Sequence, residues 1–147
     1  MQNELIENIK SLSQSGKHRD EILDIIVETL DNEYEYYDWV GFYIIVDGKL
    51  VLGPYRGKSS PHEVIEFNEG ICGAAARTKS TIIVNDVNSD PRYLACSVET
   101  KSEIVVPILS NGDIVAQIEF DSSTPAAFTE KDKVILEQIA GIISVLF

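Results

Sequence analysis

The sequence Ile104-Val-Val-Pro-Ile-Leu-Ser-Asn-Gly-Asp-Ile-Val-Ala-Gln-Ile-Glu-Phe120 contains two apolar runs, one on each side of Asn111-Gly112. An Asn-Gly pair between such runs favours a tight hairpin, because both residues tolerate a positive φ. The sequence therefore predicts strands over residues 104–109 and 114–120. A second hairpin is predicted at Asp47-Gly48, between strands over residues 37–46 and 49–55.

The rest of the chain alternates between helical and extended patterns. Apolar residues at helical spacing predict one helix before Ser15-Gly16 and a second helix that Asp20 would cap. Short strands are predicted over residues 63–67 and 81–84, with an Ala-rich helix over residues 71–77 between them. Residues 85–94 are polar and are expected to form an exposed loop. The last helix would begin after Thr129, with Asp132 in the reciprocal position of a capping box.

These elements predict a single α+β domain over residues 1–147. Because hairpins dominate, the central sheet should be mainly antiparallel, with the N- and C-terminal helices packed on one of its faces. A chain of this length buries roughly two-thirds of its unfolded surface, so it needs neither a disulfide nor a metal to hold its core.

The charge and the lack of known motifs exclude several classes of function. A formal net charge of −12 argues against nucleic acid and against an anionic membrane as partners. No apolar run is long enough to span a membrane, and the first residues lack the features of a signal peptide, so we expect a cytoplasmic protein. His18 and His62 have no ligand spacing to a cysteine, and no nucleotide-binding motif is present, so the sequence predicts neither a metal nor a cofactor.

The chain has two cysteines, Cys72 and Cys96. Cys96 follows a polar segment and precedes Ser102-Glu103 at the start of a predicted strand, so its thiol could reach a substrate, and Cys72 could accept a bond from it. The other interpretation is that both residues are small hydrophobes of the core. The residues alone leave both interpretations open.

Several segments along the chain carry a more specific pattern. They are Trp39-Val-Gly-Phe-Tyr43, Leu50-Val-Leu-Gly-Pro-Tyr-Arg-Gly-Lys58, Gly70-Ile-Cys-Gly-Ala-Ala75, Asp86-Val87, Leu94-Ala-Cys96, Ser102-Glu-Ile-Val-Val-Pro107 and Ile118-Glu-Phe-Asp-Ser122. In this combination the chain resembles the free methionine-(R)-sulfoxide reductases, which are stand-alone GAF domains. The resemblance covers nearly the whole chain from about residue 20, and it implies a single GAF domain with reductase activity.

The resemblance also implies a role for each matching residue. Cys96 would attack the sulfoxide sulfur, and Cys72 would be a second cysteine in the same pocket. The acids expected around the sulfoxide oxygen are Glu103, Glu119 and Asp121. The aromatic residues expected to enclose the substrate methyl group are Trp39 and Tyr43. The implied partners are a thioredoxin-type reductant and a second copy of the chain in a homodimer.

The chemistry explains why a thiol and acids would occur together. A sulfoxide is a poor electrophile until its oxygen is protonated or strongly hydrogen-bonded, and burial among like charges raises the pKa of at least one carboxyl enough to supply that proton. Attack by the thiolate leaves a sulfenic acid, which a second thiol converts to a disulfide that a reductant resets. The same negative cluster opposes ionisation of the thiol.

The chain departs from the family at one point. Family members commonly have a third cysteine shortly after the residues that correspond to Gly57-Lys58, where this chain has Ser59-Ser-Pro-His62. The sequence is therefore a two-cysteine variant. Three outcomes stay open: Cys72 resolves the sulfenic acid, an external thiol does so, or catalytic turnover is lost.

Whether the acids can converge depends on the second hairpin. A two-residue loop at Asn111-Gly112 would place Glu103 on the face opposite to Glu119 and Asp121. A three-residue loop over residues 110–112 with a bulge would instead place Glu103 directly opposite Glu119. We expect the three-residue loop.

The same residues also allow other interpretations. Glu119 and Asp121 alternate with apolar residues, as on an ordinary solvated strand face. Trp39 and Tyr43 could be plain core aromatics, and they share a face only if the strand between them is regular. The competing functions are a GAF sensor that binds a small ligand without catalysis, and an interaction module that dimerises through its terminal helices.

Overall fold

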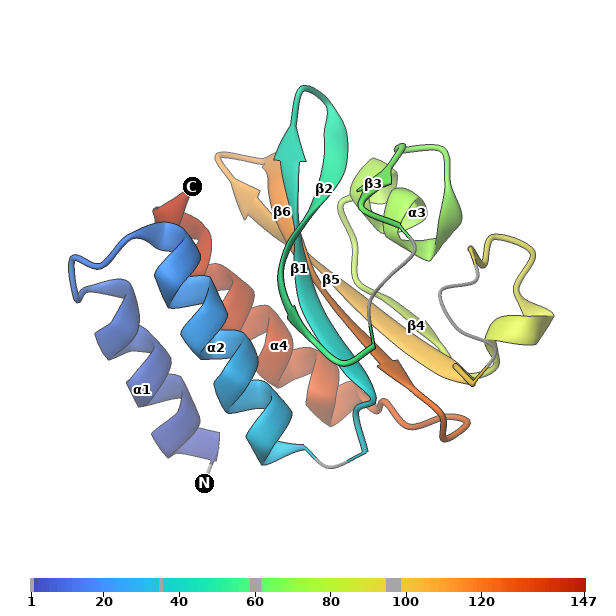
Figure 1. Cartoon of the computed structure of the whole chain (residues 1–147), viewed down its shortest axis with the longest axis horizontal. Coiled ribbons are helices and arrows are strands. Elements are labelled where there is room, and N and C mark those ends of the chain that lie inside the picture. Colours follow the sequence, from blue (N-terminus) through green and yellow to red (C-terminus); the bar gives the residue numbers. More distant parts are fainter. Residues whose placement is uncertain (1, 35, 59–61, 95–98) are drawn as a thin grey trace.

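The computed structural model describes residues 2–34, 36–58, 62–94 and 99–147 (Figure 1). Its strands are β1 (Trp39–Val46), β2 (Lys49–Arg56), β3 (Val64–Ile65), β4 (Ile82–Val84), β5 (Ser102–Ser110) and β6 (Asp113–Ser122). Its helices are α1 (Gln2–Ser13), α2 (Arg19–Glu33), α3 (Gly70–Thr78) and α4 (Glu130–Ile143), with short 3₁₀ turns η1 (Val87–Ser89) and η2 (Ser144–Leu146). The predicted α+β class is confirmed.

The strands form one sheet in the order β3-β2-β1-β6-β5-β4, and every neighbouring pair is antiparallel. Both predicted hairpins are present. Asp47 and Gly48 have φ angles of 52° and 74°, and Asn111 and Gly112 have φ angles of 53° and 81°. Positive φ at both central residues is what a type I′ turn requires, and this turn matches the twist of the flanking strands.

The two faces of the sheet are covered differently (Figure 1). Helices α1, α2 and α4 pack on one face, as predicted, over a core that includes the fully buried Phe42, Ile104 and Phe120. Helix α3 lies on the other face, where its buried side chains belong to a second apolar cluster. Val87 of η1 is part of this cluster and anchors the otherwise exposed loop over residues 85–94. The central strands are therefore buried on both faces, so polar side chains under α3 are enclosed by protein.

The helix ends follow local sequence signals, with one exception. The Thr129 hydroxyl accepts the Asp132 N–H at 3.4 Å, and the Asp132 carboxylate accepts the Thr129 N–H at 2.8 Å, which confirms the capping box. The prediction that Asp20 caps α2 is wrong, because His18 occupies that position without a side-chain bond. Asp20 lies in the first turn, where its charge favours the positive end of the helix. No helix in the described ranges combines the length and apolar character needed to cross a membrane.

The second hairpin differs from the prediction in its loop. Ser110 pairs with Asp113, so the expected three-residue loop over residues 110–112 is wrong and the turn has two residues. The register nevertheless shifts between residues 108 and 109, because Val115 is an extra residue on β6. Without this bulge, a residue of β5 would share its face with one alternate set of β6 residues. With the bulge, it shares its face with the other set.

Candidate active site

The bulge brings three acids to the α3 side of the sheet. Glu103 pairs directly with Asp121, and Glu119 lies two residues along the same face. The predicted pairing of Glu103 with Glu119 is wrong. It required the extra residue to be Ser110, at the end of β5, whereas the extra residue is Val115 on β6. The solvated-face interpretation is also wrong, since Glu103, Glu119 and Asp121 are only 3%, 3% and 4% exposed.

Trp39 and Tyr43 share this face, because β1 is regular against β6 between them. Their rings are stacked with centroids 6.3 Å apart. Gly41 lies between them, and a Cβ at this position would be 2.5 Å from the Trp39 ring. The missing side chain lets the indole lie along the strand, so β1 forms an aromatic wall beside the acids.

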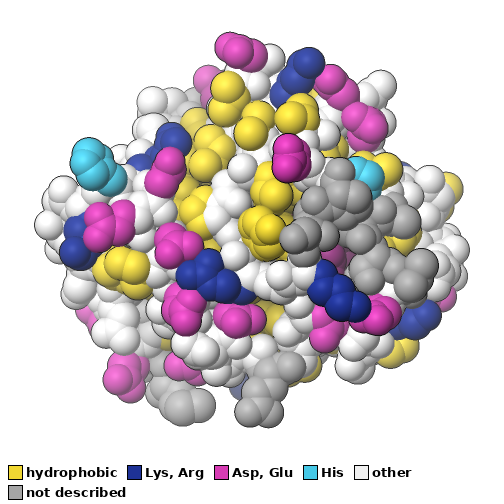
Figure 2. Space-filling view, in the orientation of Figure 1, with side chains coloured by type: hydrophobic (Ala, Val, Ile, Leu, Met, Phe, Trp, Pro, Cys, Tyr) yellow, Lys and Arg dark blue, Asp and Glu magenta, His cyan; other side chains and the backbone are white. Residues whose placement is uncertain are grey.

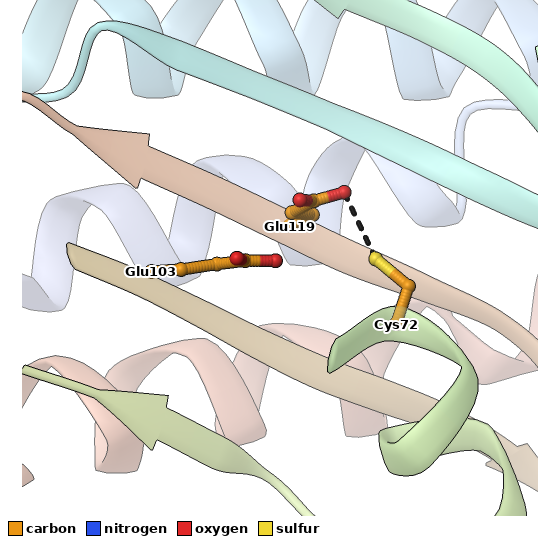
Figure 3. Close-up of side chains that lie close together, drawn as sticks. All are labelled: Cys72, Glu103 and Glu119. Carbon is orange, nitrogen blue, oxygen red and sulfur yellow. Dashed lines mark hydrogen bonds between the residues drawn. The ribbon is translucent and has the colours of Figure 1, made fainter. Parts of the chain in front are cut away.

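Cys72 reaches the acids from α3. This helix lies so close to the preceding segment that a Cβ on Gly73 would be 2.7 Å from the Phe67 carbonyl oxygen. The Cys72 thiol donates to Glu119 Oε2 at 3.0 Å, and the Glu103 carboxyl points into the same space (Figure 3). A thiol and two carboxyls from three separate elements therefore converge.

Gln117 belongs to this site, although the sequence reasoning missed it. Its side chain is fully buried, and its Nε2 donates to the Cys72 carbonyl at 2.9 Å. Gln117 therefore ties the first turn of α3 to β6, which holds the Cys72 thiol above Glu119. The signal was present, because Gln117 has the same strand parity as Glu119 and Asp121.

The environment of the cluster favours the neutral forms of Glu103, Asp121 and the Cys72 thiol. Burial, and then the charge of Glu119, raise the pKa of Glu103 and of Asp121 well above their usual range. Burial, with Glu119 and Glu103 next in size, also raises the pKa of the Cys72 thiol. The site can hold a carboxylic acid proton near neutral pH, and Cys72 stays a thiol there.

Stability should fall as pH rises because of these acids. Their ordinary pKa values are 4.5 for Glu103 and 3.8 for Asp121, and both are raised on folding, so the folded chain binds more protons than the unfolded chain between about pH 4 and the raised values. Each extra proton makes the free energy of unfolding fall by up to about 1.4 kcal/mol per pH unit. Urea denaturation with a chelator present, from about pH 5 to pH 8, measures this slope.

The control is the double variant Glu103→Gln/Asp121→Asn, in which the slope should flatten. The measurement starts near pH 5 to exclude the titration of Asp24 and Asp90. Arginine neighbours lower the pKa values of both groups, so they titrate below this range. A wild-type slope equal to that of the double variant would contradict the assignment of these raised values.

A small cavity lies between α3 and the acids. Its volume is about 10 Å³, and it is lined by Cys72, Glu103, Glu119, Leu94 and by Ile65, Gly70 and Ile71. An amino-acid substrate therefore needs room beyond this cavity. The predicted nucleophile Cys96 lies outside the described residues, as does any bond between it and Cys72, but Leu94, two positions before it, lines the cavity.

Comparison with known proteins gives a family and related sequences. A profile described as "GAF domain" matches residues 16–147. The free methionine-R-sulfoxide reductase of Saccharomyces cerevisiae is 45% identical over 111 residues, which cover 73% of this chain. The matched region spans 61% of the length of that yeast relative.

Solved structures give the same picture over the whole fold. The free methionine-R-sulfoxide reductase of Neisseria meningitidis, in complex with its substrate, has a TM-score of 0.94 and 32% identity, covering 100% of this chain and 88% of that chain. The corresponding protein of Staphylococcus aureus, also with substrate, has a TM-score of 0.90 and 32% identity, covering 99% and 94%.

Proposed function

Because the chain belongs to the GAF-domain family, and within it to the free methionine-R-sulfoxide reductases, we propose that it reduces free methionine (R)-sulfoxide to methionine. The observation that carries the proposal is the buried cluster in which the Cys72 thiol, Glu103, Glu119 and Asp121 converge beside the aromatic wall. The acids supply a protonated group for the sulfoxide oxygen, and the rings of Trp39 and Tyr43 supply apolar surface for the methyl group.

The proposed reaction has three steps. The Cys96 thiolate attacks the sulfoxide sulfur and forms a bond to it, while an acid of the cluster protonates the oxygen. The oxygen then passes to the Cys96 sulfur as the bond between the two sulfurs and the original S–O bond break, so that methionine leaves and Cys96 is oxidised to a sulfenic acid. The Cys72 thiol then forms a disulfide with Cys96 and releases water. A thioredoxin-type dithiol, present in a reducing compartment such as the cytoplasm, returns both cysteines to thiols.

The two-cysteine arrangement sets a requirement on Cys72. It is 3% exposed and bonded to Glu119, so this hydrogen bond must break before its sulfur attacks the sulfenic acid of Cys96. Their Cα atoms must then approach within about 7 Å. We assign the resolving role to Cys72, with an external thiol as the alternative.

The homodimer is part of the same proposal. Val134 of α4 and Val145 of η2 are exposed by 54% and 75%, which leaves apolar surface on the layer of terminal helices. We assign the dimer contact to this layer. A sensor site for a cyclic nucleotide is disfavoured, because the charged groups under α3 are acids and would repel a phosphate.

The direct test offers the purified protein free methionine (R)-sulfoxide, the (S) epimer and a peptide containing the (R) epimer, each with dithiothreitol. Methionine should form from the free (R) epimer alone, as followed by mass spectrometry. No turnover with any of them, or equal turnover of both epimers, would overturn the proposed function.

Gly41→Ala should damage the aromatic wall. The new Cβ would lie 2.5 Å from the Trp39 ring and 2.7 Å from the Tyr55 Cβ, so the indole has to move. Overpacking of this kind costs about 1–3 kcal/mol of stability. Trp39 is the only tryptophan in the chain, so its fluorescence emission should change, and KM for the sulfoxide should rise.

Gly141→Ala is the matched control, because nothing lies within 4 Å of its added Cβ. It should leave both the fluorescence and KM unchanged. If Gly41→Ala kept the fluorescence and KM of the wild type, the position of the Trp39 ring would not depend on the space above Gly41, and the prediction would be wrong.

A further inference from the structure

The groups under α3 also have the arrangement of a metal ligand set. The Cys72 Sγ and one carboxylate oxygen each from Glu103 and Glu119 all lie within 4.8 Å of one another, and the Sγ is 3.0 Å from Glu119 Oε2 (Figure 3). Ligand atoms of a tetrahedral zinc ion, bound at about 2.1–2.3 Å, lie about 3.5 Å apart. If these three ligand atoms moved about 1 Å closer to one another, they would form a three-ligand site.

The space between these ligands has the size of an ion. The cavity that they line has a volume of about 10 Å³, close to the space of one water molecule. Its other walls include Ile65, Ile71 and Leu94. A cation that keeps its hydration shell does not fit, whereas one that exchanges water for protein ligands does.

Asp121 supplies an independent observation. It is 4% exposed, and its Oδ1 is buried without a hydrogen-bond partner among the described residues. It pairs with Glu103 across β5 and β6, so its carboxyl belongs to the same cluster. A buried oxygen without a partner is destabilising, and the positive charge of a cation in the neighbouring ligand set would offset part of that cost.

We propose that the reduced protein binds one thiophilic divalent cation, of the class of Zn²⁺, through Cys72 Sγ, Glu103 and Glu119, with Asp121 beside them. Thiolate ligation selects zinc and cadmium over magnesium and calcium. Binding releases to solvent both the thiol proton and the carboxyl proton that the buried acids hold near neutral pH, and a thiolate with two carboxylates more than balances the charge of the ion. The ion occupies Glu103 and Glu119, the acids of the proposed reductase, as well as its resolving thiol, so it inhibits that activity, but the binding itself does not rest on the proposed function.

The experiment uses Cys96→Ser, which leaves Cys72 as the only cysteine. Addition of Cd²⁺ should produce a thiolate charge-transfer band in the ultraviolet that saturates at one ion per chain. Competition with a chromophoric chelator measures Zn²⁺ affinity. Further replacement of Cys72 by serine should remove the band and weaken Zn²⁺ binding by at least roughly 100-fold.

Two further variants in the same background separate this site from general surface binding. Glu119→Gln should weaken Zn²⁺ binding by at least roughly 10-fold. Glu7→Gln, whose side chain on α1 is 70% exposed, should leave it unchanged. Absence of the band, or equal Zn²⁺ affinity with and without Cys72, overturns the proposal. If the double cysteine variant does not fold, as judged by circular dichroism, the same comparison between wild type and Cys72→Ser decides it.

Discussion

Replacement of Cys96 by serine is expected to lower kcat/KM for free methionine (R)-sulfoxide by at least roughly 1,000-fold. A serine hydroxyl has nearly the same shape as the thiol but is a far weaker nucleophile, and it cannot carry the oxygen as a sulfenic acid. The effect should therefore fall on the chemical step, with little change in the free energy of unfolding. Steady-state kinetics with dithiothreitol, and urea denaturation of the same samples, measure both quantities.

Cys72→Ser is the matched control, because it removes the other thiol of the same chain. It should keep turnover supported by dithiothreitol, because this external thiol can replace Cys72 in the resolving step. It should lose turnover supported by thioredoxin, because the disulfide between Cys72 and Cys96 that thioredoxin reduces can no longer form. Turnover that survives Cys96→Ser would eliminate Cys96 as the nucleophile. Equal losses in Cys72→Ser with both reductants would instead assign Cys72 a part in the attack on the sulfoxide.

Glu103→Gln is expected to lower kcat by about 100-fold or more, which is the usual contribution of a positioned general acid. The amide keeps the shape of the carboxyl but cannot transfer a proton to the sulfoxide oxygen. Burial and the charge of Glu119 raise the pKa of Glu103, so the substitution also removes an unfavourable ionisation. The variant should be at least as stable as wild type near neutral pH, and kinetics with parallel denaturation measure the contrast.

Two comparisons isolate this effect. Asp121→Asn tests the direct partner of Glu103, and the larger loss of kcat identifies which acid donates the proton. Asp113→Asn changes a carboxylate on the same hairpin whose side chain is 85% exposed, and it should leave kcat unchanged. An unchanged kcat in both Glu103→Gln and Asp121→Asn would remove the acids from the mechanism.

The fold was predictable where local signals determine it. Asp47-Gly48 and Asn111-Gly112 carry positive φ angles that few other residue pairs accept, so both hairpins follow from the sequence. The capping box at Thr129 is equally local. Asp20 shows the limit, because a suitable capping side chain two residues after His18 does not decide where the helix begins.

The register of the second hairpin was not predictable from its turn. The extra residue, Val115, lies between apolar neighbours with no Gly or Pro to mark a bulge. Packing on both faces determines its position, because only a shifted register places Ile104 and Phe120 under the helices while Glu103 and Asp121 lie under α3. The shared face of the acids was foreseen, but the partner of Glu103 was not.

The acids and aromatic residues of the candidate site were predictable from the sequence. The prediction of the rest of the site was incomplete. The resemblance to a family supplied the acids, and strand parity then extends the set to Gln117. The convergence of Cys72 with Glu103 and Glu119 depends on where α3 packs on the sheet, which no spacing along the chain reveals. Figure 2 shows hydrophobic side chains gathered on one face of the molecule, with acidic and basic side chains around them.

A single-turnover experiment with Cys72→Ser tests the central claim most directly. The reduced variant is mixed with excess methionine (R)-sulfoxide and no reductant, and the products are quenched with a reagent that traps sulfenic acids. Mass spectrometry should find one methionine formed per chain and one trapped sulfenic acid, located on Cys96. Methionine formed without oxidation of Cys96, or no methionine from a folded variant, would contradict an account in which that sulfur accepts the oxygen of the substrate.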